Sequence, residues 1–508
     1  MEPKPGQLRD GVFLGATQSL CPECMELVQA KIVARGSRIY FDKFCSRHGS
    51  RSDFVCSSRR WFDRNEFAVP GRLPVSFGVE PKLGCPYDCG LCTAHEQHTC
   101  IAVLEVTSSC NLSCPMCYAS SGPGGQHLSF EECCAAIDRL VMVEGQPEIL
   151  QLSGGEPTIH PQFAEIFEYA CSQPIDLVMI NTNGIRLAND RRLCKLLARY
   201  QSRCQVYLQM DGLSDQVHGV LRGVSLLDTK LRAIEMLGEF GINTTLVTTL
   251  QTDLNLGEVG GLVRFAIERP WITGVSFQPA TYVGRSVLPE NLERRITFPD
   301  VIAAVEEQTD GLFRNNDFFP VPCAHPNAHT LSYAFRQGNS VIPITRFVNI
   351  DKHFDLLANG ISLNRQNTRE IVSKFMARMA CGTGGGEGCG ESMEQRIGPS
   401  ANQEVLPTET AEFAELAGGF FARAIAEDLA AADMFRITTT SFMDAYNFDV
   451  RQIMKSCVHH LLPSGHLIPF CAYNLLYRDG RVSLPMLNGL PQRSAQNSTS
   501  NRLPIFVP

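Results

Sequence analysis

The chain has 508 residues, a net charge of −8 at pH 7 and 44% hydrophobic residues, a composition typical of globular proteins. Because this length exceeds what one ordinary hydrophobic core organises, two or three domains are expected. The acidic balance argues against a nucleic-acid-binding surface, and no run of eighteen apolar residues predicts a membrane-spanning helix.

Twenty-one cysteines are unusually many, and most of them occur in close spacings such as C-x2-C and C-x3-C. The first twenty residues lack a basic start followed by an apolar run, so we expect no signal peptide and a cytoplasmic location. In a reducing compartment, closely spaced thiols indicate metal binding rather than disulfides. Five others are interpreted as buried apolar residues: Cys133, Cys134, Cys171, Cys194 and Cys204.

The first zone, residues 1–78, is predicted to be a small metal-binding ribbon of short strands and turns. It contains CPEC at 21–24 and KFCSRHG at 43–49. Cys21 and Cys24 form one half of a tetrahedral site, and Cys45 with either His48 or Cys56 forms the other. We favour Cys45 and His48, holding one structural zinc or rubredoxin-like iron that stabilises this small zone.

The segment CPYDCGLCTAHEQHTC places four thiols within sixteen residues, directly before the first predicted strand of the next zone. Four closely spaced thiolates can hold a complete [4Fe–4S] cluster, with zinc as the alternative. A closed cluster of this kind serves electron relay or structure. Its predicted ligands are Cys85, Cys89, Cys92 and Cys100.

Residues 79–300 alternate between strand-like and helix-like patterns. The predicted strands are 101–107, 148–154, 175–182, 204–211, 242–250 and 274–280. Ser129 and Glu132 form a predicted capping box before the first helix. The strands recur about every thirty residues, which indicates right-handed βαβ units with parallel strands. Six units are too few for a closed eight-stranded barrel, so an open partial barrel or a doubly wound sheet is expected.

The sequence CNLSCPMCY at 110–118 falls in the loop after the first predicted strand. Three thiolates can bind three irons of a [4Fe–4S] cluster and leave the fourth iron open, while a zinc site completed by a distant cysteine is the alternative. The next strand ends in SGGEPT at 153–158, where two glycines allow a ligand to approach and Glu156 can accept from an ammonium group. Further polar groups follow later strands: Asn181, Asn183, Asp211 and Gln278. Each can cap a turn, but together they favour a pocket.

Residues 301–508 are less regular. Cys323, Cys457 and Cys471 are candidates for a third cluster near the substrate, with isolated buried thiols as the alternative. A broad apolar helical pattern at 407–435 fits a helix packed in the core, and also fits one resting on a bilayer or lining a lipid tunnel.

The middle zone resembles the radical S-adenosylmethionine (SAM) enzymes, through Cys110, Cys114 and Cys117 and through the GGEP sequence. The resemblance implies that the three cysteines bind a [4Fe–4S] cluster whose open iron is chelated by SAM. It also implies that Gly154, Gly155, Glu156 and Pro157 form the segment that contacts the methionine amino group, and that reductive cleavage of SAM yields a 5′-deoxyadenosyl radical that removes a hydrogen atom from the substrate.

Most of the chain is similar to a narrower group, the archaeal tetraether lipid synthase and its relatives labelled as dihydropterin methyltransferase-like. The stretches that carry this resemblance include PYDCGLC, LQMDGL, FMDAYNFDV and IPFCAYN. It implies three [4Fe–4S] clusters and a rubredoxin-like site. The sequence PCAHPNAH departs from this pattern, since a cysteine is expected near Ala328. A third cluster is then absent or takes a ligand from Cys381, Cys389, His325 or His329.

We therefore expect a partial (β/α)6 TIM-type barrel, with an N-terminal metal ribbon and a C-terminal auxiliary-cluster domain beginning at residue 301. The main functional hypothesis is carbon–carbon bond formation on a lipid alkyl chain. The alternatives are methylation of a pterin or another small molecule, and a non-catalytic iron–sulfur electron-transfer protein. The expected partners are a reduced flavodoxin- or ferredoxin-like donor and the substrate, without nucleic acid, and contact with the inner face of the membrane belongs to the lipid hypothesis.

Overall fold

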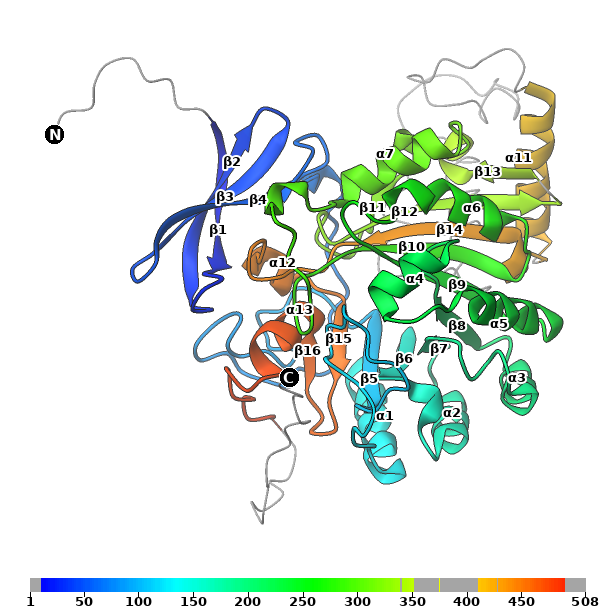
Figure 1. The fold of residues 1–508 in the computed structure, drawn as a ribbon, viewed down its shortest axis with the longest axis horizontal. Helices are drawn as coiled ribbons and strands as arrows, with labels where there is room; N and C mark the ends of the chain where they lie inside the picture. Colours follow the sequence, from blue (N-terminus) through cyan, green and yellow to red (C-terminus); the bar gives the residue numbers. More distant parts are fainter. Residues whose placement is uncertain (1–10, 339, 351–373, 375–409, 427, 489–508) are drawn as a thin grey trace.

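The computed structural model describes residues 11–338, 340–350, 374, 410–426 and 428–488 (Figure 1). The N-terminal part is a four-stranded antiparallel sheet in the order β1-β2-β3-β4. Its strands are β1 (Val12–Leu20), β2 (Leu27–Arg35), β3 (Arg38–Cys45) and β4 (Gly49–Cys56). The β1–β2 and β3–β4 turns carry the CPEC and CSRH sequences, so the antiparallel pairing brings the two halves of the predicted metal site to one end of the ribbon.

A buried lysine attaches the ribbon to the rest of the molecule. Lys43 pairs with Asp53 at 3.0 Å, and both side chains are almost fully buried. Its ammonium group also donates to the carbonyl oxygens of Ala445 and Tyr446, which lie far along the chain. Because a buried charge is tolerated only when it is paired and hydrogen-bonded, these contacts define how the ribbon docks.

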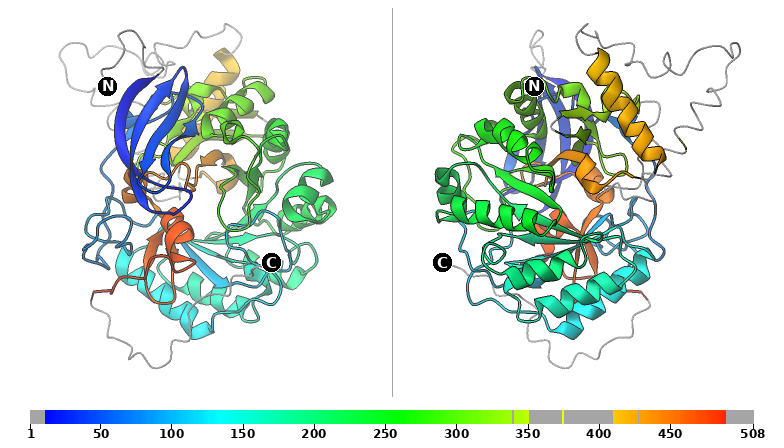
Figure 2. Two further views of the ribbon diagram at one scale, coloured as in Figure 1. Left: turned by 60° about the vertical axis from the view of Figure 1, so that its left-hand side comes forward. Right: turned by 90° about the vertical axis from the view of Figure 1, so that its right-hand side faces the viewer.

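The central sheet contains the six predicted parallel strands in sequential order. They are β5 (Ile101–Thr107), β6 (Ile149–Gly154), β7 (Leu177–Thr182), β8 (Cys204–Gln209), β9 (Thr244–Leu250) and β10 (Ile272–Pro279). The helices are α1 (Phe130–Glu144), α2 (Phe163–Ser172), α3 (Arg191–Ala198), α4 (Asp215–Arg222), α5 (Leu227–Glu239), α6 (Val259–Ile267) and α7 (Phe298–Gln308). They cover the outer face of the curved sheet (Figure 2), and the predicted capping box of Ser129 and Glu132 begins α1.

Alternation along the strands separates the two faces of this sheet. Side chains such as Leu150, Val178 and Val206 are fully buried in the core between sheet and helices. Their neighbours in sequence, including Gln151 and Met179, line a cavity on the opposite face. This period of two places polar groups on the inner face without exposing the apolar core.

Strands from the C-terminal zone extend the same sheet on both sides. Next to β10 lies β14 (Met434–Thr440) in parallel, followed by the antiparallel β12 (His329–Gln337). On the other side β15 (Val458–Leu461) runs parallel to β5 and pairs with β16 (Leu467–Pro469). Two short strands, β11 (Phe319–Pro320) and β13 (Ser340–Pro343), pair with β12. The sheet thus continues across the boundary drawn at residue 300.

The remaining helices are α11 (Thr410–Ile425), α12 (Val450–Met454) and α13 (Phe470–Ala472), which continues into the π-helical turn η9 (Tyr473–Tyr477). In α11, Phe420 and Phe421 are buried against Phe347, and Phe420 also contacts Phe335. These two aromatic side chains of the helix therefore pack within the protein, whereas Ile425 near its end is exposed. Among the described residues, none of the helices combines the length and apolar character needed to cross a membrane.

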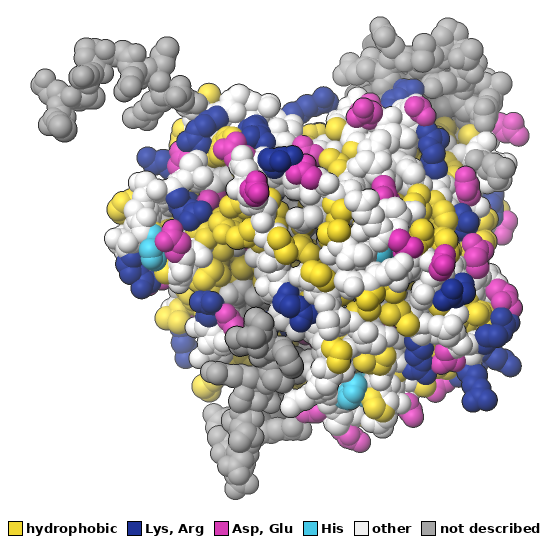
Figure 3. Space-filling view, in the orientation of Figure 1, with side chains coloured by type: hydrophobic (Ala, Val, Ile, Leu, Met, Phe, Trp, Pro, Cys, Tyr) yellow, Lys and Arg dark blue, Asp and Glu magenta, His cyan; other side chains and the backbone are white. Residues whose placement is uncertain are grey.

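Charges of both signs are interspersed over the face shown in Figure 3. This distribution agrees with the modest net charge of −8. A field of mixed sign gives little long-range attraction for a polyanion.

Candidate functional site

The loop after β5 brings the three cysteines of CNLSCPMCY to one cavity. Cys110, Cys114 and Cys117 line it, and the first two are buried. Burial raises the pKa of the Cys110 thiol to about 12, and the nearby Glu156, Cys114 and Cys117 add to this effect. The cavity has a volume of about 200 Å³. It lies at the carboxyl ends of the parallel strands, the usual position of an active site in this type of fold.

Arg285, in the segment after β10, holds this loop in place. Its guanidinium donates to the carbonyl oxygen of Cys114 at 3.1 Å and to that of Ser120 at 3.2 Å. Its backbone exchanges two hydrogen bonds with Cys117, of 2.8 and 3.0 Å. The preceding Gly284 has a φ of +64°, and a Cβ there would overlap the carbonyl oxygens of Cys117 and Tyr118. The sequence analysis missed both residues, because YVGR carries no recognised motif.

The spacing of the three thiols fits a cluster better than a single ion. A tetrahedral zinc with Zn–S bonds of about 2.3 Å holds its sulfur ligands about 3.8 Å apart. Within the described residues, the metal-ligand groups whose atoms all lie within 4.8 Å of one another do not include Cys110, Cys114 and Cys117. A [4Fe–4S] cluster binds each thiolate through a different iron and so requires wider spacing. The donor set therefore fits a cluster with one open iron.

The GGEP segment packs closely against the end of β5. Gly155 and Glu156 donate their backbone N–H groups to the carbonyl oxygens of Thr107 and Ser109, at 2.8 and 2.9 Å. A Cβ on either Gly154 or Gly155 would overlap these same carbonyl oxygens. Both glycines line the cavity, which leaves backbone atoms exposed to a ligand there.

Glu156 is not among the residues that line the cavity, and its predicted contact with an ammonium group stays a prediction. Its side chain is buried, and Oε1 accepts from the Thr158 hydroxyl at 2.6 Å and from the Thr182 hydroxyl at 2.7 Å. The Thr158 N–H also donates to Oε1, and the Asn183 N–H donates to Oε2 at 2.7 Å. Three of these donors reach Oε1 and one reaches Oε2, which keeps a further acceptor position, and together they tie the segment after β6 to the end of β7.

The other predicted pocket residues divide into two groups. Asn183 and Gln278 line the cavity, whereas Pro157 and Asp211 are not among its lining residues. Asp211 is fully buried and pairs with Arg222, which lies at the end of α4, through two contacts of 2.6 and 2.7 Å. Arg222 itself lines the cavity and interacts with the Cys114 thiol. Sequence reasoning found the carboxylate but missed the arginine that it orients.

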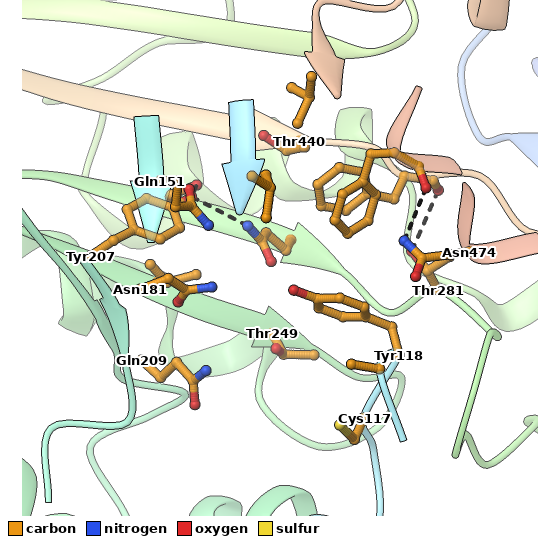
Figure 4. Close-up of a pocket in the computed structure, with 18 of the residues that line it drawn as sticks. Cys117, Tyr118, Gln151, Asn181, Tyr207, Gln209, Thr249, Thr281, Thr440 and Asn474 are labelled. Carbon is orange, nitrogen blue, oxygen red and sulfur yellow. Dashed lines mark hydrogen bonds between the residues drawn. The ribbon is translucent and has the colours of Figure 1, made fainter. Parts of the chain in front are cut away.

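Polar side chains from successive strands face the cavity (Figure 4). Gln151, Asn181, Gln209 and Thr249 come from β6 to β9 and lie on the same side of the space as Tyr207, while Cys117 and Tyr118 border it from the loop. Gln278 donates to the Tyr207 hydroxyl at 3.2 Å. This part of the wall therefore offers amide and hydroxyl groups to a hydrogen-bonding ligand, while apolar side chains such as Val103, Met179 and Val247 line much of the rest.

The ribbon brings Cys21, Cys24, Cys45 and His48 within 4.8 Å of one another. The Cys24 and Cys45 sulfurs are 3.8 Å apart, and His48 Nδ1 lies 3.4 Å from the Cys21 sulfur and 3.5 Å from that of Cys45. These distances match the edges of a tetrahedron around one zinc ion. Cys56 instead packs in the hydrophobic core. The residues present thus fit a single metal ion in the favoured Cys3His arrangement.

The predicted group of four thiols at 85–100 is divided. Cys85, Cys89 and Cys92 interact with one another. The Cys100 sulfur instead lies 3.7 Å from that of Cys323, and Cys457 belongs to the same group. The grouping of Cys100 with the first three cysteines is therefore wrong, because the chain turns away toward β5 before residue 100.

The third predicted thiol of the C-terminal zone also lies elsewhere. Cys471 lines the cavity and accepts from the Met443 N–H at 3.2 Å, apart from Cys323 and Cys457. His329 lines the cavity beside Thr440, and His325 Nδ1 accepts from the Asn327 N–H. The remaining ligand candidates, Cys381 and Cys389, lie outside the described residues.

Comparison with known proteins agrees with this geometry. The model of the radical SAM superfamily matches residues 104–266, and that of the HMPTM N-terminal zinc ribbon domain matches residues 13–57. Over 502 residues the chain is 32% identical to the 7,8-dihydro-6-hydroxymethylpterin dimethyltransferase of Methanocaldococcus jannaschii, covering 92% of this chain and 96% of that protein. The chain is a radical SAM enzyme that belongs to the family of this dimethyltransferase, and it accordingly uses a [4Fe–4S] cluster and SAM.

More distant similarities cover less of the chain. The mycofactocin maturase MftC of Mycobacterium ulcerans is 32% identical over 166 residues, which is 32% of this chain and 42% of that protein. The crystal structure of Streptococcus suis SuiB has a TM-score of 0.35 at 18% identity, covering 42% of this chain and 46% of that one. A radical SAM methyltransferase from Sphaerobacter thermophilus has a TM-score of 0.31 at 13% identity, covering 60% and 75%.

Proposed function

We propose that this enzyme is a methyltransferase that acts on a pterin or a chemically similar small heterocycle. The amide groups that Gln151, Asn181 and Gln209 present to the cavity carry this proposal, because a lipid alkyl chain offers no partners for them. The full-length similarity to a pterin dimethyltransferase supports it. Both observations favour this hypothesis over bond formation between lipid chains. The burial of Phe420 and Phe421 of α11 within the protein is in keeping with a core-packed helix.

In this proposal Cys110, Cys114 and Cys117 are the cluster ligands. A cluster held there would supply the electron for reductive cleavage of SAM, and the 5′-deoxyadenosyl radical so formed would take a hydrogen atom from a carbon that no side-chain base can deprotonate. The backbone of Gly154 and Gly155 offers carbonyl oxygens to the methionine ammonium group. Arg222, fixed by Asp211, offers a positive charge to the methionine carboxylate or to the anionic cluster.

The substrate then lies between the strand amides and the loop. Gln151, Asn181 and Gln209 provide both donors and acceptors, which match the ring nitrogens and carbonyl oxygen of a pterin. On the side of Cys117, the ring of Tyr118 packs edge-on against Phe470 at 5.1 Å, and Phe470 stacks on Phe442 at 4.2 Å. These aromatic side chains are suited to contact the faces of a flat heterocycle.

The test uses full-length protein whose clusters are reconstituted anaerobically, supplied with SAM, a low-potential reductant and 7,8-dihydro-6-hydroxymethylpterin. Mass spectrometry is expected to detect 5′-deoxyadenosine together with methylated pterin. Asn181→Leu should reduce pterin methylation at least about tenfold, since it removes one paired polar contact. The wild type should also cleave SAM reductively when no pterin is present, and Asn181→Leu should keep this activity. The two assays together separate substrate binding from cluster chemistry.

A membrane diether lipid offered under identical conditions is the competing substrate. Coupling of its alkyl chains without any pterin methylation would overturn the proposal and restore the lipid hypothesis. Turnover of neither substrate, in protein that still cleaves SAM, would also contradict the assignment of a pterin-like substrate.

A further inference from the structure

The inner face of the sheet carries a layer of side chains well below the cysteine loop, here called the deep layer. Strand register aligns one residue from each of six neighbouring strands, from β7 across to β12. Because paired residues of neighbouring strands point to the same face, the deep layer consists of Asn181, Tyr207, Thr245, Gly274, Arg436 and Tyr333. Asn181, Tyr207 and Arg436 line the cavity, and Figure 4 shows the first two on its wall.

The deep layer lies at the end of the cavity away from the cysteine loop. Along β14, Arg436 precedes Thr440 by four residues, and Thr440 pairs with His329 where the strand ends. At about 3.3 Å per residue, these two positions on β14 are roughly 13 Å apart. Both side chains line the cavity. The cavity therefore extends from the strand ends, where the cysteines lie, down to Arg436.

The charged side chains that line this cavity are all positive. Three arginines line it, and no aspartate or glutamate is among its lining residues in the part of the chain that the structure describes. Arg222 pairs with Asp211, and Arg285 donates to carbonyl oxygens of the cysteine loop. The third, Arg436, interacts with the hydroxyl group of Tyr333 in the deep layer. Its positive charge there attracts a negatively charged group strongly, because a mostly apolar cavity screens charge less than water does.

Two neighbours of Arg436 in the deep layer suit a bound anion. The Thr245 side chain is buried, and its hydroxyl has no hydrogen-bond partner among the described residues. Between these two residues, Gly274 contributes no side chain, and a Cβ there would lie 2.5 Å from the Arg436 carbonyl oxygen. A buried hydroxyl without a partner costs free energy unless a ligand or a water bonds to it. The deep layer therefore offers a hydroxyl donor near the guanidinium group.

We propose that Arg436 and Thr245 bind an anionic group of the substrate, and that this substrate is a pterin-type heterocycle carrying a phosphate ester. The inference rests on the proposed function, in which the ring contacts Gln151, Asn181 and Gln209. A guanidinium group can donate two parallel hydrogen bonds to a phosphate, and a threonine hydroxyl can add a third. The hydroxymethyl group of 7,8-dihydro-6-hydroxymethylpterin is the position where such an ester attaches. A phosphate held in the deep layer determines which end of the substrate faces the cysteine loop.

Equilibrium dialysis of the full-length protein, reconstituted anaerobically, compares 7,8-dihydro-6-hydroxymethylpterin with its monophosphate ester. The wild type is expected to bind the ester at least about tenfold more tightly, since a charged hydrogen bond is added. Arg436→Gln should lose this preference and keep its affinity for the neutral pterin. Arg436→Lys retains the charge without the planar fork, so it should keep part of the preference. The matched control is Arg199→Gln, which removes the charge of an exposed arginine outside the cavity and should bind both probes as the wild type does.

Equal binding of the two probes by the wild type would overturn the proposal, and this comparison does not depend on any variant that fails to fold. Equal binding would agree with compensation of Arg436 by Glu148, whose charge reaches Tyr333 from outside the cavity lining. A preference for the ester that survives in Arg436→Gln would overturn the proposal as well. Both results leave the proposed function intact, since the neutral pterin still binds. Binding of neither probe, by protein that cleaves SAM, would instead contradict the proposed function together with this inference.

Discussion

Two groups of three cysteines in this molecule differ in both sequence and geometry. Cys110, Cys114 and Cys117 fall within eight consecutive positions and lie in a loop beside a cavity. Their sulfur atoms do not all lie within 4.8 Å of one another. Cys100, Cys323 and Cys457 are spread over more than three hundred residues, yet their sulfurs lie within 4.8 Å of one another in the buried interior. The comparison teaches that a motif in one short segment can be read from the sequence, whereas a group assembled from distant segments is seen only in the fold.

The largest effect that would separate the two groups is expected from Cys114→Ala. This change removes one proposed cluster ligand, so formation of 5′-deoxyadenosine should fall to background, as measured by mass spectrometry after anaerobic reconstitution. Cys133→Ala, which changes a buried cysteine outside both groups, should keep full formation of 5′-deoxyadenosine. Continued SAM cleavage by Cys114→Ala would break the comparison, because the loop would then not hold the reactive cluster.

Replacing Arg222, which lines the cavity beside Cys114, should destabilise the protein strongly. Burial opposes ionisation of Asp211, but the charge of Arg222 prevails and holds the pKa of that carboxyl below its usual value. Arg222→Met therefore leaves a buried carboxylate without its partner, at a cost of about 3–5 kcal/mol in the free energy of unfolding. Urea denaturation measures the loss.

The double variant Arg222→Met with Asp211→Leu is the control for this pair. It removes both charges and should recover much of the lost stability, because replacing a buried ion pair by apolar groups is often neutral. If the single and double variants are equally unstable, the arginine contributes through packing and not through its charge.

A change at Gly284 tests how the loop is held without touching a ligand. Gly284→Ala introduces a Cβ where φ is +64° and where the carbonyl oxygens of Cys117 and Tyr118 approach closely. We expect a loss of about 1–3 kcal/mol in stability and a lower yield of reconstituted cluster. Gly257→Ala is a suitable control, since no atom lies within 4 Å of its Cβ position. Equal cluster yields for the two variants would show that this support is dispensable.

The sequence predicts the main sheet well and its edges poorly. All six strands from β5 to β10 are confirmed, because each is a β-branched segment followed by a helix at a regular interval. The flanking strands β14 and β15 were missed: their partners lie more than a hundred residues away, and VHHL is too short to give a periodic pattern. Local pattern cannot reveal a pairing between distant segments.

The candidate site shows the same limit. The three loop cysteines and the two glycines of GGEP reach the cavity because one short segment places each set. The hydrogen bonds that Glu156 accepts from Thr182 and Asn183 were not predicted, since only folding brings these residues to it. Cys100 was grouped by its distance along the chain, whereas its neighbours Cys323 and Cys457 are set by the order of strands in the sheet.

The smallest predicted effect on the free energy of unfolding concerns Lys230, a lysine that contacts the end of β7 near the cysteine loop. Lys230 is fully buried and donates to the Asn183 carbonyl oxygen at 2.5 Å. Burial, together with the charge of Arg222, lowers the pKa of Lys230 to about 8. The unfolded chain retains the ordinary pKa of about 10.4, so between these values the unfolded state binds more protons and stability rises with pH. Below pH 8 both states carry the charge, and its burial is a constant penalty.

Lys230→Met removes this titration while keeping a similar volume. From pH 7.5 to 9.5, the wild type should gain about 1–2 kcal/mol in the free energy of unfolding relative to the variant. Urea denaturation at several pH values measures the difference, and Lys31→Met, at an exposed position in the ribbon, provides the reference for nonspecific effects. A difference that is flat or falls with pH would mean that Lys230 keeps its ordinary pKa. In that case the Asn183 carbonyl oxygen and its polar neighbours would compensate for the burial of the ammonium group.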